Sequence, residues 1–354
     1  MASKDRVLEA LSGVMDPEIG RSLVELGMIR GVEVSDGKVA VQIALTTMGC
    51  PLKGRIADDA RNAVLAVPGV NDVKVDLVAM TEQEKARAFG RGQEEERPHA
   101  ENHVKQVIAV MSGKGGVGKS LVSGLLAVSL AKRGLKVGVL DADVTGPSIP
   151  KMFGLRTRPQ AGPLGVLPVA SKNGIGIISI NLFLEREDEA VIWRGPMITS
   201  AIKQFWEDVV WGDLDYLFVD LPPGTSDAPL SVMQTLPVAG AVVVSSPQDL
   251  AGMIVRKAVR MTEHMEVPVV GVVENMSYFQ CPDTGKRYEI FGPSRGEQLA
   301  KVAGAPLLAK LPIDPEAARL CDEGRIEDYK ADAVKELGDA FLKATARVAT
   351  VSKR

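Results

Sequence analysis

The sequence has little cysteine: three residues, Cys50, Cys281 and Cys321, occur in 354 and lie far apart along the chain. Three thiols cannot form the disulfide network that stabilises many small secreted proteins. They also cannot complete a four-cysteine metal site within one chain. Histidine is equally scarce, and His99 and His103 lie in a polar stretch that offers no framework for a metal. A thiolate site for iron therefore cannot be complete in a single copy of this chain.

Long apolar runs and a strong excess of one charge are absent as well. No apolar run reaches the roughly 18 residues that indicate a membrane span, and the charged opening MASKDRVLEA does not resemble a signal peptide. The formal net charge of -3 gives no basic field of the kind that dominates nucleic-acid binding. We therefore expect a cytoplasmic protein that binds neither nucleic acid nor a membrane.

The first part of the chain, residues 1–80, predicts a small α+β domain. A helical pattern from Lys4 to Val14 is followed by two alternating runs around Asp36-Gly37, a pair that favours a tight hairpin turn. A second helical pattern over residues 52–67 and a strand-like run over residues 71–78 complete the order αββαβ.

A polar segment, residues 81–103, separates this domain from residues 104–354 and predicts a linker, because it is nearly free of large apolar side chains. In the longer part, strand-like runs alternate with helical stretches. Several of these runs are continuously apolar, as in strands that are buried on both faces. We therefore expect an α/β fold with a mostly parallel sheet covered by helices. The strand-like runs are Gln106–Met111, Lys136–Leu140, Tyr216–Val219, Ala239–Ser245, Pro268–Val273 and Pro306–Leu308.

A glycine-rich segment, GKGGVGKS, lies between the apolar run VIAVMS and a helical stretch. Its spacing is that of a P-loop, and a strand before it with a helix after it is the context that this motif requires. Glycines let backbone N–H groups turn towards phosphates, and a helix N-terminus favours negative charge. We expect Lys119 to reach the β- and γ-phosphates of ATP and the Ser120 hydroxyl to bind Mg²⁺. The predicted nucleotide-binding residues of the loop are Gly113, Lys114, Gly115, Gly116, Val117, Gly118, Lys119 and Ser120.

Polar side chains end three of the predicted strands. Asp141 and Asp143 end VGVLDAD, Asp220 ends YLFVD, and Asn275 ends VVGVVEN. Ligands bind at the carboxyl ends of parallel strands, where Asp220 is suited to hold Mg²⁺ through water. The Asn275 amide offers a donor and an acceptor that match the edge of adenine. Helix capping by any one aspartate and a simple turn at Asn275 are the alternatives.

The form KGGVGK, with Lys114 after the first glycine, resembles the deviant P-loop of the MinD, ParA and nitrogenase-iron-protein group. This resemblance implies that Lys114 reaches across a homodimer interface to the partner's nucleotide; a solvated lysine is the alternative. It also implies that Asp143 orients the attacking water, that Asn275 recognises adenine and that Asp141 belongs to the nucleotide-dependent switch. The γ-phosphate sensor in this resemblance is Pro223, Gly224 and Thr225, and the catalytic residues are Lys114, Lys119 and Asp143.

Further segments resemble the Mrp/ApbC family of iron–sulfur cluster carrier ATPases, from about Val104 to Tyr329: DADVTGPSIPKMFG, WRGPM, DLPPGTSD, ENMSYF and EIFG. The motifs DPE at 16–18 and TTMGCP at 46–51 resemble the small domain that precedes many bacterial members. The resemblance implies a homodimer with slow ATP hydrolysis that holds a four-iron four-sulfur cluster between its subunits. Assembly factors would supply the cluster, and apo-protein clients would receive it.

In many members of that family, a CxxC pair in each subunit supplies the cluster thiolates. The matching stretch here is CPDT, with Cys281 followed by Thr284, whose hydroxyl is a poor substitute for sulfur. Three interpretations stay open: a labile cluster completed by other ligands, handling of the cluster through Cys50, or loss of this role. Cys50 lies in a Gly-Cys-Pro turn before a helix, which favours the thiolate. Cys321 lies in a helical pattern and is expected in the core.

Two other functions remain open at this point. A positioning ATPase of the MinD or ParA type would bind DNA or a membrane surface, and the amphipathic last helix with its basic end fits the second possibility. An ATP-dependent adaptor in iron–sulfur maturation that ligates no cluster follows from the threonine at position 284.

Overall fold

A computed structural model describes residues 3–16, 22–35, 37–45, 53–81, 102–143, 146–184, 195–225, 227–248 and 251–351. Contacts divide the chain into two compact units, residues 1–97 and 98–354. Most of the predicted linker, from residue 82 to residue 101, lies outside the described residues. Within the described residues, no helix combines the length and the apolar character needed to cross a membrane.

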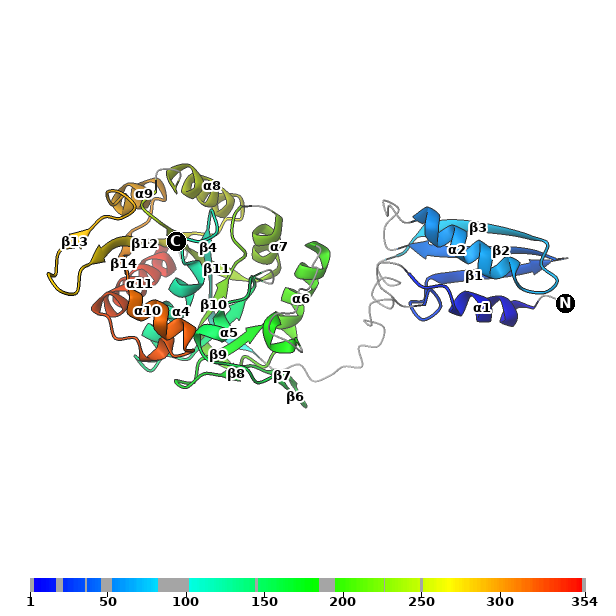
Figure 1. The fold of residues 1–354 in the computed structure, drawn as a ribbon, viewed down its shortest axis with the longest axis horizontal. Helices are drawn as coiled ribbons and strands as arrows, with labels where there is room; N and C mark the ends of the chain where they lie inside the picture. The colour runs from blue at the N-terminus through cyan, green and yellow to red at the C-terminus, as the bar shows by residue number, and fades with distance from the viewer. Residues whose placement is uncertain are drawn as a thin grey trace. The chain divides into compact units, whose positions relative to one another are not determined.

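The described residues of the N-terminal unit form two helices and a three-stranded sheet (Figure 1). The central strand of this sheet pairs antiparallel with the first strand and parallel with the last. Buried residues of both helices join alternate residues of the central strand in one core, so the sheet has one buried face. The element order is the predicted αββαβ: α1 (Lys4–Ser12), β1 (Ile29–Ser35), β2 (Lys38–Leu45), α2 (Lys53–Leu65) and β3 (Asp72–Ala79).

In the C-terminal unit, nine strands of the described chain form one sheet in the order β13-β12-β11-β4-β10-β5-β9-β8, with β14 pairing with β12. The pairs are parallel except at β13 and β8. The mostly parallel sheet predicted from the sequence is therefore confirmed. The strands are β4 (His103–Ser112), β5 (Val137–Asp141), β8 (Val169–Ala170), β9 (Gly176–Ser179), β10 (Asp213–Asp220), β11 (Val238–Ser245), β12 (Val269–Gln280), β13 (Arg287–Tyr288) and β14 (Leu307–Ile313).

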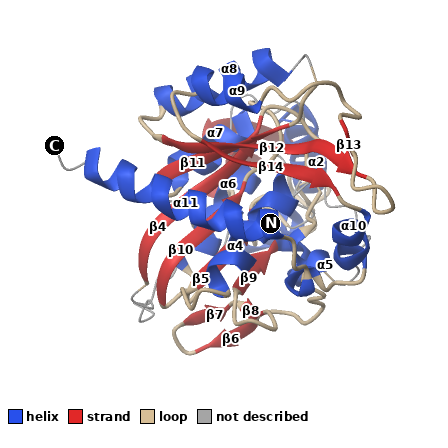
Figure 2. Ribbon diagram, turned by 90° about the vertical axis from the view of Figure 1, so that its left-hand side faces the viewer, coloured by secondary structure: helices blue, strands red, loops and turns tan. Residues whose placement is uncertain are grey.

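Helices cover both faces of this sheet, as Figure 2 shows for α4 and α11 on one of them. Alternate residues of β4 enter two different cores: Ile108 and Val110 pack with α4 and α11, whereas Val107 and Ala109 pack with α6, α7 and α8. Burial on both faces explains the continuously apolar runs in the sequence. The helices of this unit are α4 (Lys119–Ala131), α5 (Ile149–Met152), α6 (Gly195–Glu207), α7 (Asp227–Thr235), α8 (Ala251–His264), α9 (Gly296–Val302), α10 (Pro315–Asp322) and α11 (Asp332–Val351).

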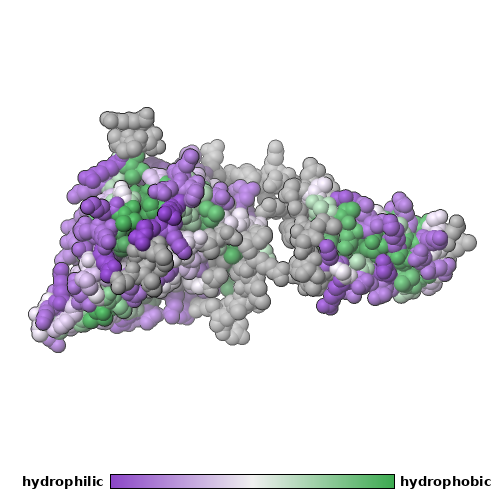
Figure 3. All heavy atoms as spheres, turned by 90° about the horizontal axis from the view of Figure 1, so that it is seen from above, coloured by the Kyte–Doolittle hydropathy of each residue, from purple (hydrophilic) through white to green (hydrophobic). Residues whose placement is uncertain are grey.

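Short elements complete the C-terminal unit. A small hairpin joins β6 (Gln160–Gly162) to β7 (Gly165–Leu167), and two 3₁₀ helices span Ile180–Phe183 and Ile326–Asp328. In Figure 3, hydrophilic side chains cover most of the visible described surface of this unit, with hydrophobic areas between them. The buried apolar residues of this unit form two cores.

Several strands are longer than their sequence patterns indicate, and β12 is extended furthest. The apolar run predicted a strand over residues 268–273, but β12 continues to Gln280. The added part contains polar residues that break the apolar pattern. It is held by parallel pairing with β14 and by a short antiparallel pairing with β13. Its backbone hydrogen bonds therefore come from segments far along the chain, which a local pattern does not contain.

Candidate nucleotide-binding site and cysteine turn

The predicted P-loop joins the end of β4 to the beginning of α4, where ten buried residues of the helix fix its position on the sheet. Gly116 and Gly118 adopt φ values of 78° and 79°, in the left-handed region that favours glycine. A Cβ atom at Gly118 would also lie 2.2 Å from Nδ2 of Asn275. The loop therefore requires glycine at 118 for two separate reasons, its backbone conformation and the neighbouring amide.

Lys119, the first residue of α4, lies between carboxylates from two strands. Its Nζ atom is 2.7 Å from Oδ2 of Asp220 at the end of β10 and 3.9 Å from Oδ2 of Asp143 after β5. The lysine side chain is 6% exposed, and that of Asp220 is fully buried. The structure thus brings one positively charged and two negatively charged side chains together from positions that are far apart in the sequence.

Asp220 also accepts two hydroxyl hydrogen bonds from α4. Ser120 Oγ lies 2.5 Å from Oδ2, and Ser123 Oγ lies 2.7 Å from Oδ1. A hydroxyl and a carboxylate in contact are oxygen donors of the kind that Mg²⁺ prefers, so the pair Ser120 and Asp220 fits this ion. Ser123 was not among the predicted residues. Its spacing of three from Ser120, which places both on one helix face, is the signal that would have indicated it.

Asp141 and Asp143 differ in environment although they are two residues apart. Asp141 is fully buried, and its carboxylate accepts hydrogen bonds from Ser179 Oγ at 3.1 Å and from the N–H groups of Asp143 and Ile149. Burial first, and then the nearby Asp220 carboxylate, raise the pKa of Asp141 to about 8. Asp141 therefore orders the turn after β5, whereas Asp143 is the carboxylate that approaches Lys119.

The loop around residues 223–225 is tied to the P-loop through the backbone. The N–H of Gly224 donates to the carbonyl of Ser112 at 2.9 Å, and the Ser112 hydroxyl donates to the carbonyl of Lys114 at 3.0 Å. The Lys114 ammonium group donates to the side-chain carbonyl of Gln248 in the same chain. Gln248 was not among the predicted residues, because its position after β11 gives no local sign of this contact.

Asn275 in β12 also contacts the P-loop. Its side chain is 2% exposed, and Nδ2 donates to the carbonyl of Val117 at 2.9 Å. The amide therefore lies at the loop, and one of its hydrogen-bonding groups is used by the protein itself.

The CPDT segment forms a tight turn between β12 and β13. The N–H of Cys281 donates to the carbonyl of Lys286, and the N–H of Gly285 donates back to the carbonyl of Cys281. The Thr284 hydroxyl first, and then the backbone N–H groups of Thr284 and Asp283, hydrogen-bond to the sulfur and lower the pKa of Cys281. Thr284 thus supports the thiolate form of Cys281 instead of adding a second thiolate.

Neither of the other two cysteines has a described environment like that of Cys281. Cys321 in α10 is partly buried against the core, and burial, followed by the charge of Asp322, raises its pKa to about 11. Cys50 lies outside the described residues. Among the residues that the structure describes, no three His, Cys, Asp or Glu side chains gather closely enough to hold a metal ion.

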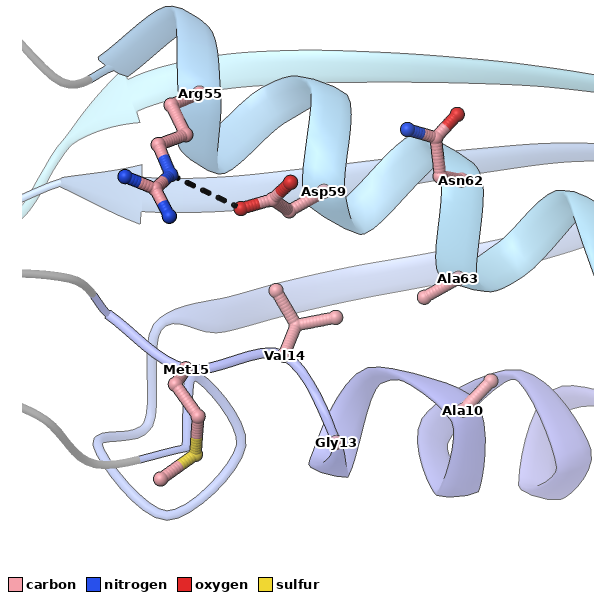
Figure 4. A pocket seen from close by; sticks show the side chains of 8 residues that line it. All are labelled: Ala10, Gly13, Val14, Met15, Arg55, Asp59, Asn62 and Ala63. Carbon is pink, nitrogen blue, oxygen red and sulfur yellow. Dashed lines mark ion pairs between the residues drawn. The ribbon is translucent and has the colours of Figure 1, made fainter.

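The N-terminal unit contains a separate cavity of about 440 Å³ beside the end of α1 and along α2 (Figure 4). Arg55 and Asp59 line it and form an exposed ion pair of 3.7 Å, while Val14 and Met15 line the other side. Such an exposed pair contributes little to stability. The described lining contains neither cysteine nor histidine, so this cavity offers no thiolate or imidazole ligand.

Comparison with known proteins connects both units to iron–sulfur biology. Residues 103–349 match the model of a family described as NUBPL iron-transfer P-loop NTPase, and residues 4–77 match one described as iron-sulfur cluster assembly protein. The iron-sulfur cluster carrier protein of Deinococcus radiodurans is 46% identical over 321 residues, 90% of this chain and 87% of that protein. Its counterpart in Synechocystis is 44% identical over 319 residues, covering 89% and 88%.

A solved structure is similar to the C-terminal unit. The nucleotide-binding protein from Archaeoglobus fulgidus, determined in complex with ADP, is 46% identical and has a TM-score of 0.60. The match covers 65% of this chain and 90% of that chain.

Proposed function

Because this chain belongs to the NUBPL-type iron-transfer P-loop NTPases, we propose that it is an iron–sulfur cluster carrier that binds clusters and delivers them to apo-proteins under the control of ATP. The observation that carries this proposal is the presence, in one chain, of a P-loop with its carboxylates and of a partly exposed cysteine whose pKa is lowered by hydrogen bonds to its sulfur. A region similar to iron–sulfur assembly proteins precedes them, and we propose that residues 1–80 act as a separate module for cluster exchange.

In the proposed mechanism, the P-loop N–H groups and Lys119 bind the phosphates of ATP. Ser120 and Asp220 would hold Mg²⁺, which neutralises phosphate charge when bound. Asp143, the less buried of the two carboxylates after β5, would orient the attacking water. Asp141 fixes the turn that carries Asp143. The loop 223–225 would sense the γ-phosphate, because Gly224 is already bonded to the strand that leads into the P-loop.

The cluster is the cargo of this cycle. We propose a homodimer that holds a four-iron four-sulfur cluster through the Cys281 thiolates of its two subunits. Two sulfurs are fewer than the four that such clusters usually receive, so the remaining positions would be open to ligands from assembly factors or clients. Such a partial ligand set favours release over storage, which suits a carrier.

The proposal is tested by reconstituting the full-length protein anaerobically with iron and sulfide. We expect it to retain both and to activate an apo-enzyme that requires a four-iron four-sulfur cluster, with ATP changing the rate of transfer. A protein that retains neither iron nor sulfide but still accelerates maturation by other carriers would indicate the adaptor function instead.

Lys114→Ala is expected to leave ATP affinity within about threefold of the wild type but to reduce hydrolysis at least about tenfold, if Lys114 stabilises transition-state charge across the dimer. Turnover and the mass of the ATP-bound species would be measured together, since loss of the ATP-dependent dimer is expected as well. Lys136→Ala, at an exposed lysine before β5, is the matched control. Normal turnover in Lys114→Ala would contradict this role.

A further inference from the structure

The middle of β12 departs from regular strand geometry next to the P-loop. Glu274 pairs with Lys310 of β14, and the next pairing joins Tyr278 to Pro312, so residues 275–277 lie opposite a single residue of β14. Met276, inside this bulge, has a φ of 55°, which is uncommon for a residue other than glycine. Such a conformation persists only where the surroundings enforce it.

A buried carboxylate enforces this bulge. Glu274 is fully buried, and its Oε2 atom accepts hydrogen bonds from Ser277 Oγ at 2.5 Å and from Ser294 Oγ at 2.7 Å. Its Oε1 atom accepts a third from the backbone N–H of Arg295 at 2.7 Å. The first bond spans the bulge, and the other two tie it to the segment before α9. Charged groups are seldom buried without such a full set of partners.

Asn275 lies between Glu274 and Met276 in the chain. Its amide contacts the P-loop at Val117 and lies against Gly118. A side chain on a bulge is aimed by the bulge, because the extra residues turn it out of the strand's regular alternation. The position of the Asn275 amide relative to the P-loop therefore depends on the bonds that Glu274 makes.

We propose that Glu274 is the positioning residue for base selection at the nucleotide site. By clamping the 275–277 bulge, Glu274 holds the Asn275 amide in the position from which this amide hydrogen-bonds to adenine. This inference rests on the proposed use of ATP and of Asn275 as the base contact. An amide held in one orientation presents its donor and acceptor in a fixed order. One such order matches adenine and opposes guanine, whose edge carries the reverse pattern.

A second buried glutamate in the same chain has a purely structural role. Glu327 also accepts three hydrogen bonds, from Ser171 Oγ and from the N–H groups of Lys172 and Asn173. These bonds hold a surface turn before β9 and involve no residue of the P-loop. Glu327 is therefore a matched control for the loss of a buried, triply bonded carboxylate.

The experiment compares the affinities of the full-length variants for non-hydrolysable analogues of ATP and GTP by calorimetry at fixed Mg²⁺. We expect the wild type to prefer the ATP analogue, and both Asn275→Ala and Glu274→Ala to reduce this preference about tenfold, the equivalent of one good hydrogen bond. Glu274→Gln should retain most of the preference, because its carbonyl can still accept from Arg295 while serine hydroxyls can accept from its amide. Glu327→Ala should lower the melting temperature and leave the preference unchanged.

The outcomes separate this inference from the function on which it rests. An unchanged preference in Asn275→Ala would overturn the reading of the base by Asn275, and the inference with it. If Asn275→Ala reduces the preference for the ATP analogue but Glu274→Ala leaves it unchanged, the positioning role alone is overturned. The same holds if Glu274→Ala loses equal affinity for the ATP and GTP analogues. If Glu274→Ala does not fold, Ser277→Ala removes the bond across the bulge, and an unchanged preference there would overturn the inference equally.

Discussion

Lys119→Ala is expected to lower the affinity for MgATP at least about a hundredfold. The β- and γ-phosphates each lose a charge-assisted hydrogen bond, and each of these bonds contributes roughly 1.5–3 kcal/mol to binding. Isothermal titration calorimetry measures the loss directly. The structure adds a second effect, because Asp220 would keep its buried carboxylate without the ammonium group 2.7 Å away. Removing one partner of a buried ion pair typically costs about 3–5 kcal/mol of stability, so a lower melting temperature is expected too.

Lys119→Arg separates loss of binding from loss of stability. Arginine keeps a positive charge beside Asp220, so its melting temperature should stay closer to that of the wild type. Its planar guanidinium does not replace the compact ammonium among the phosphates, so affinity should still fall. Affinity close to the wild-type value in a folded Lys119→Ala protein would be incompatible with the P-loop assignment.

Cys281→Ala is expected to abolish stable cluster binding, with at least about tenfold less iron and labile sulfide retained after anaerobic reconstitution. Loss of a group that merely supports a metal ligand costs about 10–100-fold in affinity, and loss of the ligand itself should cost no less. Transfer to an apo-enzyme should fall in parallel. Iron and sulfide assays, together with the absorption of the cluster, measure the effect.

Three variants make this result specific. Cys321→Ala should retain the wild-type cluster content, since burial keeps that thiol protonated. Thr284→Cys restores the CxxC spacing and should increase the retained iron and sulfide, because it adds one thiolate per subunit. Cys50→Ala asks whether the N-terminal unit contributes a ligand. Equal cluster content in the wild type and in Cys281→Ala would exclude Cys281 as a required ligand and favour the adaptor function.

The lengths of strands were predicted unevenly, for a physical reason. β5, β11 and the later part of β4 lie inside the sheet, and burial on both faces leaves a continuous apolar run that their sequences display. The second half of β12 has no such run. Its structure depends on pairing with β14 and β13, and the extension that leads to Cys281 was therefore missed.

The sequence by itself determined the P-loop, its flanking strand and helix, and the aspartates that end neighbouring strands. These features are local, since glycine spacing, helix N-terminus and strand ends are all encoded within a few adjacent residues. Only the tertiary structure decided which side chains meet. The bonds of Ser123 to Asp220 and of Lys114 to Gln248 join residues 97 and 134 positions apart. The clamp of Glu274 likewise depends on how separate segments pack, because hydrogen bonds follow distance in space and not position along the chain.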